Sequence, residues 1–122
     1  MKIVILAEYG GELSFEYINE LRLNNIELDS IIFIGDRYDD YRKKLVRERT
    51  GGYYKFFELL EILNGNIIPC YFTDDVNSNL TENLLLKLKP DIVISGCTKI
   101  IKIPIWDIPQ FGMLNCHSGI VQ

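Results

Sequence analysis

The amino-acid sequence predicts an α/β fold with an open, doubly wound and mostly parallel sheet that helices flank. Three observations indicate this fold. Short apolar runs rich in β-branched residues recur along the 122-residue chain, segments with helical periodicity separate them, and the third run contains Pro69. Alternation of such runs with helices is typical of parallel sheets built from right-handed crossovers.

Five apolar runs are expected to form the strands. They have no polar face, which suits parallel strands that are covered on both sides. In chain order they are Lys2–Ala7, Ser30–Gly35, Asn66–Phe72, Asp91–Gly96 and Gly112–His117. Proline has no N–H to donate to a neighbouring strand, so the run that contains Pro69 should lie at an edge of the sheet. The Rossmann-like strand order 3-2-1-4-5 places it there.

Helices are expected in the intervals between the strands. They cover residues 14–24, 38–49, 53–63 and 78–88. Ser14 can cap the first helix, which should turn Phe15, Ile18 and Leu21 inward. The fourth helix ends before Pro90 and has leucines at helical spacing, at positions 80, 84, 85 and 88.

The predicted topology also indicates where a ligand would bind. In open parallel sheets, ligands bind beyond the carboxyl ends of the strands at the point where the strand order reverses. Here that point lies between the first and fourth strands. The chain segments that meet there are residues 8–13, residues 97–101 and the segment after His117.

Composition restricts the function classes. The length of 122 residues suits one domain, and the net charge of −4 disfavours a sequence-independent grip on nucleic acid. The three cysteines include no close pair, and no apolar run is long enough for a secretory signal or a membrane span. We therefore expect a cytoplasmic protein with reduced thiols that binds neither membranes nor nucleic acid.

Asn115 and His117 are the candidate catalytic residues. His117 is the only histidine, and it ends the last apolar run. Imidazole titrates near neutrality and can take up and return a proton. Strand alternation places Asn115 on the same face, where an amide can donate to an oxygen that gains negative charge. The alternative is that both have structural roles, as a hydrogen-bonded histidine and a capping asparagine.

Other candidate sites are weaker. A thiolate pair of Cys97 with His117, or a zinc site that adds Cys116, lacks metal-ligand spacing, so no metal is expected. Asp36 follows the second strand, as the ribose-binding acid of a dinucleotide fold does, but no GxGxxG fingerprint precedes it. The segment around Trp106 and Phe111 is expected to be a buried connector that packs against the sheet.

The stretch from Pro90 to Gly119 resembles the 10-formyltetrahydrofolate-dependent formyltransferases, which include methionyl-tRNA formyltransferase, glycinamide ribonucleotide formyltransferase and the sugar-amine N-formyltransferases. Gly112, Asn115, His117 and Gly119 match the family pattern Gly-x-x-Asn-x-His-x-Ser/Gly. The resemblance implies an enzyme that uses 10-formyltetrahydrofolate as formyl donor and a small primary amine as acceptor. An amino sugar on a nucleotide carrier is the acceptor that we expect.

The resemblance also implies roles for individual residues. Asn115 would polarise the formyl oxygen and stabilise the tetrahedral intermediate, and His117 would transfer protons. The pteridine would be held, mainly through backbone groups, by the loop that consists of Gly96, Cys97, Thr98, Lys99, Ile100 and Ile101.

The sequence departs from the family pattern in two ways. Gln122 stands where the family usually has proline, and no residue matches the family's catalytic aspartate, which lies downstream of the histidine. The resemblance therefore implies that residues 1–122 are a partial N-terminal catalytic domain, truncated after the fifth strand and inactive alone. Truncation should leave the fifth strand poorly covered around Met113 and Leu114, which favours self-association.

Two other functions remain open. One is a non-catalytic fragment that binds folate or a nucleotide, which would account for the missing aspartate. The other is an NAD-binding oxidoreductase domain, for which only the expected topology and Asp36 speak.

Overall fold

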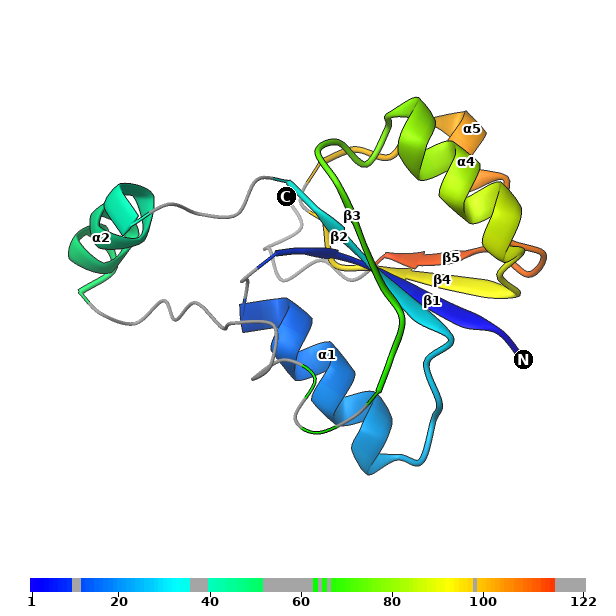
Figure 1. Cartoon of the computed structure of the whole chain (residues 1–122), viewed down its shortest axis with the longest axis horizontal. Helices are drawn as coiled ribbons and strands as arrows, with labels where there is room; N and C mark the ends of the chain where they lie inside the picture. The colour runs from blue at the N-terminus through cyan, green and yellow to red at the C-terminus, as the bar shows by residue number, and fades with distance from the viewer. Residues whose placement is uncertain are drawn as a thin grey trace, which may run out of the picture.

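The computed structural model describes residues 1–9, 12–35, 40–51, 63, 65, 67–97 and 99–115. Within this part of the chain, five parallel strands form one sheet in the order β3-β2-β1-β4-β5 (Figure 1). The strands are β1 (Ile3–Glu8), β2 (Ser30–Ile34), β3 (Cys70–Thr73), β4 (Ile92–Ser95) and β5 (Met113–Asn115). The predicted fold class and strand order are confirmed.

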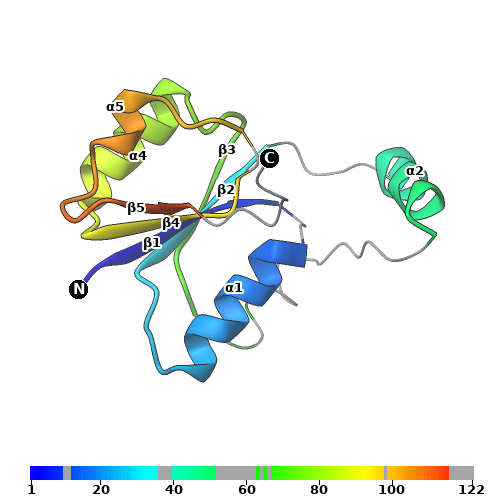
Figure 2. The same ribbon diagram turned by 180° about the vertical axis from the view of Figure 1, so that it is seen from behind.

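Helices lie on both faces of the sheet. The described helices are α1 (Glu12–Leu23), α2 (Asp40–Arg49), α4 (Asn79–Leu88) and α5 (Ile103–Trp106). Helix α1 covers one face, α4 and α5 cover the other, and α2 stands apart from the sheet (Figures 1 and 2). Most of the helix predicted over residues 53–63 lies outside the described residues.

Strand β1 is buried on both faces, as its continuous apolar sequence predicts. Val4 and Leu6 belong to the apolar cluster that includes Leu85 of α4 and Ile105 of α5. Ile5 and neighbouring residues belong to a second cluster, on the α1 side of the sheet. The two clusters hold β1 and β4 at the centre of the molecule. The strand order reverses between these two strands.

The edge position that Pro69 predicts for β3 is confirmed, although the strand begins later than expected, at Cys70. The carbonyl of Pro69 accepts a hydrogen bond of 3.0 Å from the backbone N–H of Ile31. Its missing N–H costs nothing in the sheet because β3 pairs with β2 on one side only.

Helix α4 begins and ends as predicted. The Ser78 side chain caps it by accepting a hydrogen bond of 3.2 Å from the backbone N–H of Thr81. Lys89 ends it in the left-handed conformation, with φ of 52°, one residue before Pro90. Of the leucines at helical spacing, Leu85 is buried, whereas Leu80 is half exposed. Leu80 lies in the first turn, beside the cap.

Two other predictions need correction. Helix α1 already begins at Glu12, so Ser14 lies inside the helix and does not cap it. Glu and Leu are good helix formers, which lets the helix extend ahead of Ser14. Trp106 and Phe111 are exposed, whereas Ile105 is buried. Trp106 ends α5, a single turn that cannot direct all its apolar side chains toward the sheet, and Phe111 lies beyond this helix.

No helix in the described ranges has the length and apolar character needed to cross a membrane.

Candidate functional site

The predicted site lies where β1, β4 and β5 end side by side. Leu6 on β1 is in register with Ser95 on β4, and Ser95 is in register with Asn115 on β5. Residues in register on neighbouring strands share a face, so the Asn115 side chain lies on the same face as Ser95. The loop that begins at Gly96 therefore starts one residue beyond the position opposite Asn115.

Asn115 is the last described residue of β5. Its side chain is half-buried, and its Oδ1 atom is shielded from solvent. Met113, two residues earlier, is buried in the cluster beneath α4 and α5. Asn115 therefore continues the same face of the strand toward its carboxyl end. His117, Cys116 and Gly119 lie outside the described residues, so the pairing of Asn115 with His117 stays a prediction.

Gly112, the first residue of the family-like pattern, has a backbone role. Its φ is +105°, a conformation that other residues rarely adopt. Its carbonyl accepts a hydrogen bond of 3.3 Å from the backbone N–H of Val93, at the start of the β4–β5 pair. Glycine at this position therefore allows the chain to enter β5 in the register that places Asn115 opposite Ser95.

Gly96 lies where α1 leaves little space for a side chain. Its backbone N–H donates to the Leu6 carbonyl at 2.8 Å. A Cβ atom added to Gly96 would lie 2.9 Å from Cε2 of Tyr17 on α1. The sequence suggested Gly96 as a pteridine-binding residue, and the structure adds that the ring of Tyr17 occupies the space beside it.

Cys97 points into the core. It is 4% exposed, and its backbone N–H donates to Oγ of Ser95 at 3.3 Å. Burial raises the pKa of its thiol to about 11. The hydrogen bond with Ser95 lowers this pKa, and the charge of Glu8 raises it, but both effects are smaller than that of burial. The thiol is therefore protonated at neutral pH and is a poor nucleophile.

The described ranges contain no group of three or more histidine, cysteine, aspartate or glutamate side chains placed to hold a metal ion.

The rest of the predicted pteridine loop is attached to the turn after β3. Thr98 lies outside the described residues, Lys99 and Ile100 are exposed, and Ile101 is half-buried. The Lys99 ammonium forms an ion pair of 2.8 Å with Asp75. This hydrogen bond, and a second one from the backbone of Asn77, hold the pKa of Asp75 below its ordinary value.

Asn77 makes the second connection between these loops. Its Nδ2 donates to the Ile100 carbonyl at 2.9 Å, and its Oδ1 accepts from the backbone N–H of Lys102 at 2.8 Å. Sequence reasoning missed both Asp75 and Asn77. The available signal was the three polar residues Asp74, Asp75 and Asn77 directly after a strand, because that position is at the carboxyl edge.

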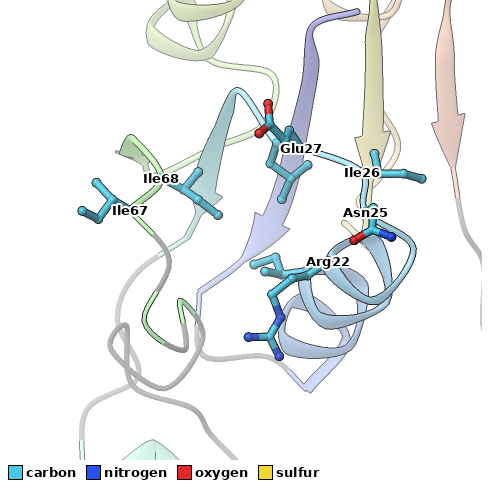
Figure 3. A pocket seen from close by; sticks show the side chains of 8 residues that line it. Arg22, Asn25, Ile26, Glu27, Ile67 and Ile68 are labelled. Atoms are coloured by element: carbon cyan, nitrogen blue, oxygen red, sulfur yellow. The ribbon is translucent and has the colours of Figure 1, made fainter.

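Two cavities lined by described residues lie at the opposite, amino edge of the sheet. The larger, of about 520 Å³, is bounded by the end of α1, the segment before β2 and the segment before β3 (Figure 3). Arg22, Glu27, Ile67 and Ile68 are among its lining residues. The smaller, of about 320 Å³, lies beside Pro90, just before β4. Neither contacts Asn115 or the loop at residues 97–101.

No protein-family model matches the sequence, and no curated protein matches it.

Proposed function

We propose that the chain is the folate-binding part of an enzyme that transfers a formyl group from 10-formyltetrahydrofolate to a primary amine of a small acceptor. The observation that carries the proposal is the position of Asn115. It ends the strand beside β4, on the face of Ser95, where the loop at residues 96–101 begins. The family-like pattern requires its asparagine at such a place.

The chemistry assigned to Asn115 suits a half-buried amide side chain. As the acceptor amine attacks the formyl carbon, a C–N bond forms and the formyl oxygen gains negative charge. An amide N–H can donate to that oxygen, and partial burial strengthens the interaction because little water competes with it.

His117 completes the proposed reaction. Its imidazole takes the proton from the attacking amine and returns it to N10 of the folate as the bond between that nitrogen and the formyl carbon breaks. The products are a formamide and tetrahydrofolate. The protonated thiol of Cys97 supports this scheme over a thioester route, because a buried thiol with a pKa of about 11 does not attack readily.

The acceptor that we propose is an amino sugar on a nucleotide carrier. The net charge of −4 gives little support for a tRNA acceptor. The segment at residues 45–63 resembles that of formyltransferase-like proteins whose acceptors are amino sugars or are unknown.

The test uses the full-length gene product, 10-formyltetrahydrofolate and a panel of nucleotide-linked amino sugars, with the formylated sugar detected by mass spectrometry. We expect turnover, with a loss of roughly 10²-fold or more in His117→Ala and in Asn115→Ala. Asn83→Ala is the matched control, since Asn83 is exposed on α4. Wild-type turnover in His117→Ala would remove that residue from the mechanism. Affinity for NAD with none for tetrahydrofolate would favour the oxidoreductase alternative.

A further inference from the structure

The loop at residues 99–102 is held in place from outside its own sequence. Asn77 lies 23 residues before Ile100 and 25 residues before Lys102, and its one side chain bonds the backbone of both. The amide uses its donor and its acceptor on a carbonyl and an N–H two residues apart. This loop segment belongs to no strand. The Asn77 amide makes the hydrogen bonds to its backbone that a neighbouring strand would make in a sheet.

Asn77 is itself held by the turn between β3 and α4. Its backbone N–H donates to Oδ1 of Asp75 at 2.9 Å. The Asp75 carbonyl accepts from Oγ1 of Thr81 at 2.7 Å, and the same Thr81 oxygen is 3.0 Å from Oγ1 of Thr73. Thr81 is fully buried. The turn that presents Asn77 is therefore fixed to the core, and it can hold the second loop in one position.

The nearby ion pair contributes less to this connection. Lys99 and Asp75 are exposed by 60% and 40%, and ion pairs this open to water are weak. The Lys99 ammonium lies at the end of a long flexible side chain, so the ion pair constrains the backbone of residue 99 less than a bond to the backbone would. The two bonds of Asn77 act directly on backbone groups.

We propose that Asn77 is a positioning residue for folate, because it fixes the peptide groups around Ile100 that hold the pteridine. This inference rests on the proposed function. Where recognition is through backbone N–H and carbonyl groups, affinity depends on how far those groups are oriented before the ligand arrives. A free loop must lose its conformational freedom on binding, and this loss weakens the affinity.

The experiment is a calorimetric titration of the protein with tetrahydrofolate in wild type, Asn77→Ala, Asn77→Asp and the control Asn83→Ala. We expect Asn77→Ala to raise the Kd about tenfold, since two hydrogen bonds that order the loop are lost. Asn77→Asp keeps the acceptor for Lys102 but loses the donor to Ile100. Its Kd should therefore lie between the Kd of wild type and that of Asn77→Ala. Asn83→Ala should bind like wild type.

Two further measurements separate positioning from general stability. Hydrogen exchange of the Lys102 amide should quicken in Asn77→Ala without folate, because its acceptor is removed. Titrations are made well below each variant's Tm, where every variant is folded, so a purely structural role would leave the Kd unchanged. Wild-type Kd in Asn77→Ala would overturn the inference alone. Failure of the wild-type protein to bind tetrahydrofolate would overturn the proposed function, and the inference with it.

Discussion

Asn115 ends β5 and Cys97 lies two residues after the end of β4, but the two side chains have different environments. Asn115 is half-buried, where an amide can meet a ligand, whereas Cys97 is 4% exposed within the apolar cluster under α4 and α5. The sequence places both at the carboxyl edge. Only the packing shows that the thiol belongs to the core, because the residues around Cys97 come from several elements.

The buried thiol predicts a specific dependence of stability on pH. The ordinary pKa of 9.0 applies in the unfolded chain, and the folded value is about 11. Above about pH 9 the unfolded chain releases this proton while the folded chain keeps it, so stability is full below about pH 9 and falls as pH rises toward about 11. Over this pH range, ionisation of the thiol should lower the free energy of unfolding by roughly 2–3 kcal/mol.

The measurement is urea unfolding of wild type and Cys97→Ala from about pH 8 to about pH 11. Other groups titrate in this range, but they are common to both proteins. The wild type should lose more stability than the variant over this interval. Parallel pH profiles would show that Cys97 is not desolvated as the structure indicates.

At the scale of elements, α1 is joined to the end of β4 through the contact between Tyr17 and Gly96. Replacing Gly96 with alanine puts a methyl carbon 2.9 Å from Cε2 of the Tyr17 ring. We expect Gly96→Ala to lower the free energy of unfolding by roughly 1–3 kcal/mol, as overpacking in a core does.

A double-mutant cycle with Tyr17→Leu, measured by urea unfolding, isolates this contact. The cost of Gly96→Ala should shrink when Tyr17 is replaced by the smaller side chain. An equal cost in both backgrounds would place the strain elsewhere, for instance in the backbone of residue 96.

Some features of the elements were predictable from local sequence and others were not. The Ser78 cap and the edge position of β3 follow from single residues with strong local effects, a hydroxyl and a proline. The start of α1 was not predictable from Ser14, because helix formers precede that residue. The exposure of Trp106 depends on where one short turn meets the sheet.

At the scale of the whole molecule, the sheet is covered unevenly. Met113 faces the layer of α4 and α5 and is buried, whereas Leu114 faces the α1 side and is 57% exposed. Ile94, in register with Leu114, packs against the cluster on the α1 side and is half-buried. The expectation that β5 would be poorly covered is therefore right for Leu114 and wrong for Met113.

The place of Asn115 at the end of β5 was predictable, but the side-chain contacts that hold the neighbouring loop were not. Alternating strands and helices, with a proline at one edge, determine the strand order and hence the place where Asn115 ends β5. The bonds of Asn77 to Ile100 and Lys102 join segments more than 20 residues apart. Such contacts depend on the exact course of two loops, which local patterns do not determine.

The central claim is that a pteridine binds at the carboxyl edge, between Asn115 and the loop at residues 99–101. The most direct measurement is a nuclear magnetic resonance titration of the isotopically labelled chain with tetrahydrofolate. Saturable shifts should concentrate at the Asn115 side-chain amide and the backbone amides of residues 99–101. Shifts absent there, or confined to the cavity between α1 and Ile67, would contradict the claim.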